Sequence, residues 1–281
     1  MIDLHTHTTA SDGTDSPFAL VNKALSAGIT TLAITDHDTT SGWSEAVQAL
    51  RAPMSLVLGA EISTLTLDGI SVHMLGLLFD GEDVEMQKML AESRDTRLPR
   101  MRKMIELLAA DGIAITMEDV MAATPYGATV GRPHLADALV RNGVVTTRDE
   151  AFLELLHNDS KYYVTHAAPT PEDAIRTIRK AGGVAVIAHP FASRRGQTIT
   201  ASTFADLVAA GLNGIEVHHR DQNAQEQETL IAIARELSLV TTGSSDYHGT
   251  GKLNGLAENT THQAQWEQLE SLANARRVVK K

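Results

Sequence analysis

Short apolar runs alternate along much of this chain with segments in which apolar residues recur at helical spacing. Apolar runs of this length, bounded by turn-forming residues, are typical of buried strands. They occur at residues 30–35, 56–60, 184–188, 214–217 and 239–243. The helical pattern predicts helices at residues 16–27, 43–50, 171–181, 201–210, 223–237 and 263–277. Because alternating strands and helices build parallel sheets or barrels, we expect an α/β fold with functional side chains at the carboxyl ends of the strands.

Two parts of the chain depart from this alternation. Residues 62–67 and 70–78 are both strand-like and flank Asp68-Gly69, which predicts a β-hairpin. Residues 83–111, 117–124, 133–142 and 148–157 have helical patterns, with Pro99 expected to break or kink the first and a strand-like run at 161–164. We therefore predict a helical insertion, residues 83–165, that covers the active site. It would interrupt a barrel made of residues 1–82 and 166–281.

Nearly every predicted strand ends in side chains that bind metals well. His5 and His7 are two apart in an extended segment, so their imidazoles point to the same side. Strand ends converge on one face, where so many ionisable groups would repel or desolvate one another without cations. The sequence therefore predicts a multinuclear metal site, although part of the Asp36–Asp38 cluster is expected to cap the following helix. The candidates are His5, His7, Asp12, Asp36, His37, Asp38, Glu61, His73, His189, Glu216, His218, Asp246 and His248.

Composition narrows the chemistry of that site. The 281-residue chain has no cysteine, so any metal must be held by histidine, aspartate and glutamate. A formal net charge of −11 argues against non-specific binding of nucleic acid through a basic surface. No apolar run approaches membrane-spanning length and no leader pattern is evident, so we expect a soluble, cytoplasmic protein without membrane contact.

The motifs at these strand ends resemble those of the PHP (polymerase and histidinol phosphatase) family. They are Asp3-Leu4-His5-Thr6-His7, Ser11-Asp12-Gly13, Ile34-Thr35-Asp36-His37-Asp38, Gly59-Ala60-Glu61, Val72-His73, Ala188-His189-Pro190 and Ser245-Asp246-Tyr247-His248. The resemblance implies a distorted seven-stranded β/α barrel with a trinuclear metal centre that hydrolyses phosphate esters. The helical insert, with Gly131-Arg132-Pro133-His134, looks like the subgroup of 3′,5′-nucleotide bisphosphate phosphatases and short-RNA 5′-exonucleases.

Carried over residue by residue, the resemblance implies three ligand sets. One metal would be held by His5, His7, Glu61 and Asp246, a second by Glu61, His73 and His189, and a third by Asp12, His37 and His248. Nitrogen and oxygen ligands suit manganese, iron or zinc, and we favour manganese. We expect a metal-bridging hydroxide to attack phosphorus in line and displace an alcohol, with Glu61, His189, Asp246 and His218 as the catalytic residues.

A second phosphate group on the substrate would need a cationic anchor away from the metals. Arginine suits that role because its planar fork matches phosphate oxygens. The candidates are Arg132, His134, Arg194 and Arg195, with Lys161 as a weaker one. His218 and His219 are expected near the mouth of the site, as proton donors to the leaving group or, as we favour, as a hydrogen-bonding wall. Arg94, Arg97 and Arg100 are expected to form a solvated helix face.

These features predict a metal-dependent phosphatase for a small phosphorylated nucleotide. The favoured reaction is removal of the 3′-phosphate from a 3′,5′-nucleotide bisphosphate such as pAp, giving AMP and phosphate. The alternatives are a 5′-to-3′ exonuclease on short RNA and a histidinol-phosphate-type phosphatase. A different class is a non-catalytic or proofreading metal module of a polymerase assembly. The acidic net charge favours the small substrate, and no stable nucleic-acid complex is expected.

Overall fold

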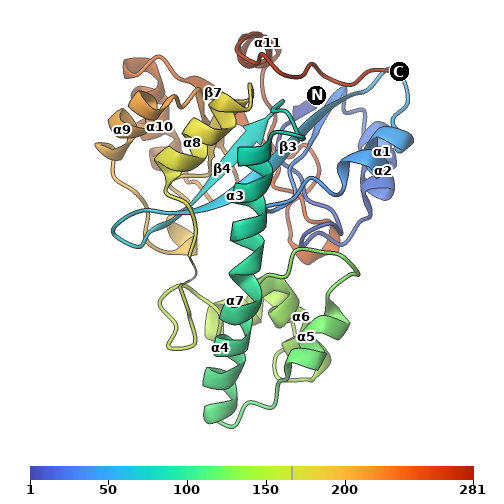
Figure 1. The fold of residues 1–281 in the computed structure, drawn as a ribbon, viewed down its shortest axis with the longest axis vertical. Helices are drawn as coiled ribbons and strands as arrows, with labels where there is room; N and C mark the ends of the chain where they lie inside the picture. Colours follow the sequence, from blue (N-terminus) through green and yellow to red (C-terminus); the bar gives the residue numbers. More distant parts are fainter. Residues whose placement is uncertain (166) are drawn as a thin grey trace.

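Seven strands form one sheet that curls into a nearly closed barrel (Figure 1). The computed structural model describes residues 1–165 and 167–281. Within these residues, neighbouring strands follow one another in sequence order: β1 (Ile2–Asp3), β2 (Thr31–Ile34), β3 (Ser55–Leu65), β4 (Ser71–Leu77), β5 (Val184–Ala188), β6 (Gly214–His218) and β7 (Val240–Gly243). A parallel bridge between Thr6 and Tyr247 joins the segments that follow β1 and β7. The predicted seven-stranded barrel is confirmed.

Strand β4 runs against both of its neighbours. It pairs antiparallel with β3 and β5, whereas the other neighbouring pairs are parallel. The hairpin predicted at Asp68-Gly69 is confirmed, and Gly69 has a φ of 82°, which glycine adopts readily. His73 lies opposite Ser63 of β3 and Ala188 of β5. The reversed strand therefore places His73 on the same rim as the carboxyl ends of its neighbours.

Helices cover the outside of the barrel. Helix α1 (Pro17–Ser26) begins after Ser16, whose side chain accepts the amide of Ala19. The other barrel helices are α2 (Trp43–Ala49), α8 (Pro171–Lys180), α9 (Thr203–Ala210), α10 (Ala224–Glu236) and α11 (Gln263–Ser271). Helix α11 ends before the predicted residue 277, and the tail beyond it returns to β3, where Val279 and Leu56 exchange backbone hydrogen bonds. No helix in the described part of the chain is long and apolar enough to cross a membrane.

A run of helices connects β4 to β5. They are α3 (Val84–Asp95), α4 (Arg97–Ala110), α5 (Met117–Ala123), α6 (Arg132–Arg141) and α7 (Arg148–Glu154). The helix predicted over 83–111 divides at Thr96, so Pro99 falls in the first turn of α4, where its missing amide costs little. The strand expected at residues 161–164 is wrong. Tyr162 packs in a helical core instead, and its hydroxyl donates to Asp111 at 2.7 Å.

The barrel and helices α4 to α7 have separate hydrophobic cores. Apolar residues of α4 to α7 pack together, including Met101, Met104, Leu108, Leu135 and Leu139. Helix α3 belongs to the barrel side, because Met86, Met89 and Leu90 pack into the barrel core. The core therefore changes between α3 and α4, where the lower lobe of Figure 1 begins. The domain division at residues 83–165 stays a prediction, and residue 166, its predicted boundary, lies outside the described residues.

Candidate metal centre and cleft

The barrel rim brings together all nine side chains predicted to bind metals. They follow or lie on β1, β2, β3, β4, β5 and β7. Their ligand atoms form overlapping groups in which each atom lies within 4.8 Å of the others. The groups are His5, His7, Glu61 and Asp246; His7, Asp12, His37 and His248; His37, Glu61 and His73; and His5, His189 and Glu216. The first group equals the first predicted ligand set, and the second group contains the whole third set.

Glu61 lies at the centre of this cluster. Its Oε2 lies 3.2 Å from His5 Nε2 and 3.1 Å from His7 Nε2. Its Oε1 lies 2.7 Å from His73 Nδ1 and 3.3 Å from His189 Nε2. Burial alone would raise the pKa of this carboxyl group, but the surrounding histidines hold its pKa well below the ordinary value. Glu61 is therefore an anion whose two oxygens face different histidines, as a bridging carboxylate must.

The imidazoles of the cluster fit a metal ion. His37 Nδ1 lies 3.1 Å from Glu61 Oε2 and His248 Nε2 lies 3.3 Å from Asp12 Oδ1. Neither buried nitrogen makes a hydrogen bond within the described residues, as expected of a nitrogen that a metal ion would occupy. Burial, together with Lys252, lowers the pKa of His248 to about 4. Neutral imidazole is the form that binds metals, so His248 suits a divalent ion. Burial opposes the charged form of His7, but Asp246 and Glu61 raise its pKa to about 9, so a metal would displace a proton there.

Asp246 connects the histidine cluster to cations of the neighbouring cleft. Its Oδ1 lies 3.5 Å from Nε2 of both His5 and His7. Its Oδ2 accepts hydrogen bonds from Arg195 Nη2 at 2.7 Å and from Lys252 Nζ at 2.9 Å. Burial opposes ionisation, yet Lys252 and the other positive neighbours hold the pKa of Asp246 well below its ordinary value. One oxygen thus faces the histidines while the other is neutralised from the cleft.

Glu216 is a buried member of the cluster that the predicted ligand sets left out. Its Oε1 lies 3.1 Å from His5 Nδ1, and its Oε2 accepts the backbone amide of His189 at 3.0 Å. Burial would raise its pKa, but His5 and other neighbours lower it to about 2. By binding Nδ1, Glu216 leaves Nε2 of His5 facing Glu61, which is how residues behind a ligand orient it. Strand alternation in the sequence indicates that Glu216 points into the barrel, because its neighbours Ile215 and Val217 pack in the core on the opposite face of β6.

Asp36 and Asp38 brace loops, and the expectation that part of this cluster caps a helix is wrong. Asp36 accepts hydrogen bonds from the Thr8 amide at 2.7 Å and the Ser11 hydroxyl at 2.7 Å. Asp38 accepts the Ser63 amide at 2.8 Å. The residue that caps α2 is Gly42. Both carboxylates are buried; Asp36 holds the loop after β1, and Asp38 ties the loop after β2 to β3, so both position segments that carry ligand candidates.

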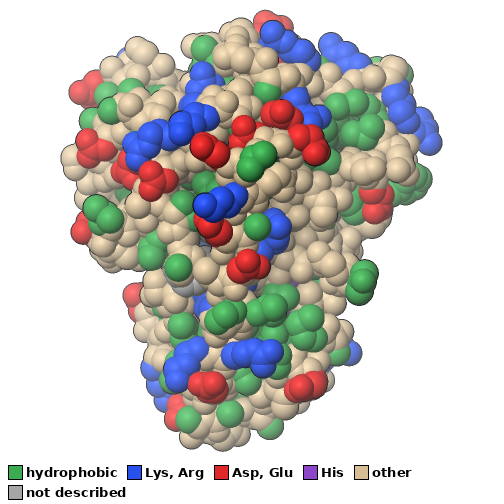
Figure 2. Space-filling model, in the orientation of Figure 1, with side chains coloured by type: hydrophobic (Ala, Val, Ile, Leu, Met, Phe, Trp, Pro, Cys, Tyr) green, Lys and Arg blue, Asp and Glu red, His purple; other side chains and the backbone are tan. Residues whose placement is uncertain are grey.

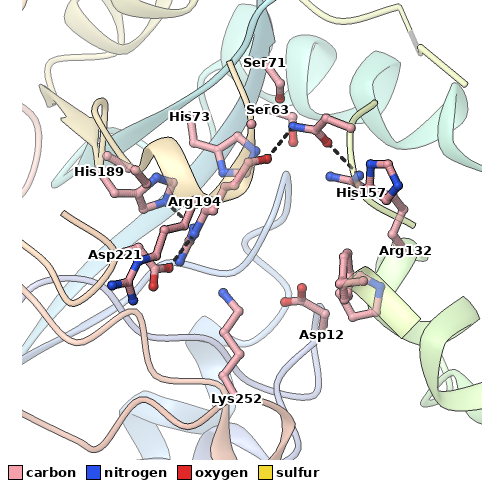
Figure 3. A pocket seen from close by; sticks show the side chains of 18 of the residues that line it. Asp12, Ser63, Ser71, His73, Arg132, His157, His189, Arg194, Asp221 and Lys252 are labelled. Carbon is pink, nitrogen blue, oxygen red and sulfur yellow. Dashed lines mark hydrogen bonds and ion pairs between the residues drawn. The ribbon is translucent and has the colours of Figure 1, made fainter. Parts of the chain in front are cut away.

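A cleft of about 850 Å³ opens between the barrel rim and the helical run (Figure 3). Asp12, His73 and His189 lie on its barrel side, facing Arg132 and His157 of the helical run. Its cationic lining residues are Arg97, Arg100, Arg132, Arg148, Arg194, Arg195, Arg220 and Lys252, and its acidic ones are Asp12, Asp149 and Asp221. Although the whole chain is acidic, this cleft therefore concentrates positive charge suited to a phosphorylated ligand.

Three of the predicted phosphate anchors line the cleft. Arg132 donates from Nη1 to Leu156 O and Asn158 Oδ1, each at 2.8 Å. Arg194 lines the wall that follows β5 (Figure 3). Arg195 also reaches the cleft, where it forms ion pairs with Asp221 and Asp246. These arginines come from two separate parts of the chain and meet only in the folded structure.

The other two predicted anchors have structural partners elsewhere. His134 is buried in α6, and its Nδ1 accepts the backbone amide of Gly131 at 3.0 Å. Lys161 is exposed and forms an ion pair with Asp111 on the outside of the helical run. Neither belongs to the described lining of the cleft. Their sequence neighbourhood suggested a role that their packing does not support.

The two adjacent histidines after β6 separate from each other. His218 Nδ1 lies 3.0 Å from Gln227 Oε1 on α10, and His218 is not among the described cleft residues. His219 is buried, with Nε2 3.4 Å from Asp246 Oδ2. An irregularity in the β6–β7 register between Glu216 and His218 accompanies this arrangement. His219 therefore lies behind the cluster, and His218 faces a helix instead of the mouth.

Arg94, Arg97 and Arg100 do not form the expected solvated face. Arg94 Nη1 donates to the backbone carbonyl of Asp38 at 2.6 Å, and Arg97 forms an ion pair with the Asp38 carboxylate. Arg100 Nε donates to Val164 O at 2.6 Å, and its guanidinium lines the cleft. The start of α4 lies between the two cores, so Arg94 and Arg97 are covered by the barrel rim and Arg100 lies at the cleft. Helical spacing alone does not show which part of the protein packs against these arginines.

The chain is similar to several known proteins. Residues 3–124 match the PHP domain. The chain is 33% identical to a 3′,5′-nucleoside bisphosphate phosphatase of Chromobacterium violaceum, over 89% of this chain and 88% of that protein. It is also 33% identical to a 5′-3′ exoribonuclease of Haemophilus influenzae, over 88% of this chain and 89% of that protein. A Bifidobacterium adolescentis structure named for metal-dependent phosphoesterase activity has a TM-score of 0.92 and 40% identity, covering 97% of this chain and 96% of that one.

Proposed function

The chain belongs to the PHP family and is a phosphoric ester hydrolase, and from that premise we propose that it removes the 3′-phosphate from a 3′,5′-nucleoside bisphosphate. With pAp as the substrate, the products would be AMP and phosphate. One observation carries this proposal: a single cleft extends from the histidine and carboxylate cluster to a group of arginines that includes Arg100, Arg132 and Arg194. A substrate with two phosphate groups matches that layout, with one group at the reacting centre and one at the anchor.

The cluster would hold three divalent metal ions, with manganese favoured. The proposed sets are His5, His7, Glu61 and Asp246; Glu61, His73 and His189; and Asp12, His37 and His248. The ligand groups support the first and third sets. The second set is supported by Glu61 Oε1, which lies 2.7 Å from His73 Nδ1 and 3.3 Å from His189 Nε2. When bound, such ions would supply activation of water and screening of phosphoryl charge.

Arg195 and Lys252 would bind the reacting phosphate group. Arg195 Nη1 lies 3.2 Å from His189 Nε2, at the edge of the ligand cluster. Lys252 lines the same cleft and reaches the same oxygen of Asp246 as Arg195. A phosphate oxygen approaching the cluster from the cleft would compete with Asp246 for these donors, and charge-assisted hydrogen bonds to phosphate are strong. The two side chains would therefore orient the phosphoryl group for attack.

Arg100 and Arg132 would form the distal anchor together with Arg194. Both guanidinium groups lie over the ring of Tyr163, at 5.1 and 5.2 Å from its centroid. Burial, followed by repulsion from Arg132, lowers the pKa of Arg100 to about 10. The hydrogen bonds described for this pair go to the neutral oxygens of Val164, Leu156 and Asn158. Their charge is thus open to compensation by a ligand, and we assign the 5′-phosphate to it.

Short-RNA 5′-to-3′ exonuclease activity is the second candidate, favoured by the equal 33% identity to the exoribonuclease relative. The deciding experiment compares phosphate release from pAp, 3′-AMP, 5′-AMP and histidinol phosphate with nucleotide release from the dinucleotide pApA. We expect pAp to give the highest kcat/KM and to yield AMP. Faster release of 5′-AMP from pApA would make the protein an exonuclease, and turnover of none would remove both candidates.

A further inference from the structure

Arg148, the first residue of α7, links the helical run to a loop that carries a proposed metal ligand. Its Nε and Nη2 meet the two carboxylate oxygens of Asp137 on α6, with Nη2 at 2.5 Å from Oδ2. Held in this way, its Nη1 donates to the backbone carbonyl of Asp12 at 3.3 Å. Only 13% of the Arg148 side chain is exposed. The guanidinium is therefore fixed on the helical side and reaches across to the barrel rim.

The same guanidinium packs against the segment that follows His248. A Cβ built on Gly251 would lie 2.0 Å from Arg148 Nη1 and 2.9 Å from its Cζ, so glycine is what leaves room for it. Thr14 ties this segment to the Asp12 loop, because its amide donates to His248 O at 3.1 Å and its Oγ1 accepts the Thr250 amide at 2.8 Å. The Asp12 and His248 loops thus form one unit, and Arg148 contacts both halves of it.

The spacing within that unit matters for a metal ion. Asp12 Oδ1 lies 3.3 Å from His248 Nε2, and the other carboxylate oxygen of Asp12 lies 3.7 Å from His37 Nε2. Functional constellations must be held to within about 0.5 Å, and residues that hold ligands from behind change metal affinity about 10–100-fold when replaced. Burial opposes the charge of Arg148, but Asp137 and then Asp12 raise its pKa. Because the main partner of that charge is Asp137, we assign Arg148 a chiefly geometric contribution.

We propose that Arg148, clamped by Asp137 and packed against Gly251, is a positioning residue that sets the Asp12–His248 pair for the third metal. This inference rests on the proposed function, which places a metal there. It gives the helical run a second task besides substrate binding. The metal centre is complete only when α6 and α7 are docked on the barrel.

The test is a Mn²⁺ titration of the metal-free full-length protein, followed calorimetrically without substrate. Asp12→Asn identifies the site that depends on Asp12. We expect Arg148→Ala to weaken that same site about tenfold or more and the others less than about twofold. Arg148→Lys and Asp137→Asn should fall between wild type and Arg148→Ala. Arg102→Ala, which removes an exposed arginine of α4, should match wild type.

Gly251→Ala perturbs the same contact from the opposite side. In the wild-type background, the added methyl group must displace the guanidinium, so the Asp12-dependent site should weaken. In the Arg148→Ala background, the same substitution should have little further effect, because the atoms it would meet are gone. If Arg148→Ala does not fold, Gly251→Ala and Arg148→Lys still carry the test.

Several outcomes would overturn the proposal. An unchanged Mn²⁺ isotherm for Arg148→Ala would remove the positioning role, and a raised KM with normal metal affinity would make Arg148 a substrate-binding residue. Additive effects of Gly251→Ala and Arg148→Ala would separate the glycine from the arginine. If Asp12→Asn alters no site, the third metal of the proposed function fails together with this inference. If wild type shows the Asp12-dependent Mn²⁺ site and Arg148→Ala binds Mn²⁺ equally well, only this inference fails and the proposed function stands.

Discussion

Removing the guanidinium of Arg97 should destabilise the junction between the barrel and the helical run. Arg97 Nε donates to Asp38 Oδ2 at 3.1 Å, its Nη2 donates to Ser63 Oγ at 2.9 Å, and its Nη1 donates to Val130 O at 3.3 Å. The Asp38 side chain is fully buried and that of Arg97 is 11% exposed. Arg97→Ala therefore leaves a buried carboxylate without its cation.

The structure sets the size of this effect. Breaking a buried ion pair by removing one partner costs about 3–5 kcal/mol. Asp38 keeps the amide and hydroxyl of Ser63 as donors, at 2.8 and 3.1 Å, so we expect the lower end, about 3 kcal/mol. For a chain of this size, that loss corresponds to a fall in Tm of roughly 5–10 °C.

Scanning calorimetry of Arg97→Ala, Asp38→Asn and the double variant measures the pair directly. Each single variant leaves one partner unsatisfied. The double variant should therefore lose about 2 kcal/mol less free energy of unfolding than the two single variants lose together. Arg102→Ala, on the exposed face of the same helix, should stay within about 0.5 kcal/mol of wild type. The reasoning is refuted if Arg97→Ala unfolds within about 1 °C of wild type, or if the single losses simply add.

Three further predictions concern the cluster and the cleft. Glu61→Gln or His189→Ala should abolish phosphate release, because Glu61 faces histidines on both sides of the cluster, and a fully active variant would contradict the proposed centre. Arg132→Ala should raise KM for pAp more than it lowers kcat, because a contact to the non-reacting phosphate contributes uniform binding; steady-state kinetics with an unchanged KM would count against it. The metal-free protein should lose stability as the pH falls from about 6.5 towards 4, because burial lowers the pKa values of His189 and His248 to about 3 and about 4. Below the ordinary pKa of histidine, the unfolded state then binds more protons than the native state. If the urea concentration at the unfolding midpoint is no lower at pH 4.5 than at pH 7, the prediction is wrong.

The barrel could be predicted because its strands are short apolar runs whose ends carry polar side chains. Position alone places His5, His37 and His189 on one rim once the strands are parallel. The segment at 161–164 could not be assigned in this way. An aromatic, β-branched run suits a strand and equally suits a loop whose ring fills a helical core, as Tyr162 does. Local pattern does not distinguish those two kinds of burial.

The candidate ligands could be identified from sequence more completely than the cations around them. Arg97 and Arg100 have the spacing of an exposed helix face, and only the docking of α4 on the barrel shows that they are covered or turned into the cleft. His218 turns towards α10 and His219 towards the cluster beside a register irregularity at the end of β6, which depends on the pairing with β7. The expected solvated arginine face and the expected place of His218 at the mouth were both wrong, because each depends on tertiary contacts that residue spacing does not encode.

The central claim is that the histidine and carboxylate cluster binds metals and that these metals are required for phosphate release. Measuring metal content and release of phosphate from pAp in the same sample tests it most directly. Protein loaded with Mn²⁺ should hold three equivalents and convert pAp to AMP, a chelator should remove both properties, and Glu61→Gln should lack both. Undiminished phosphate release by chelated, metal-free protein would contradict the account.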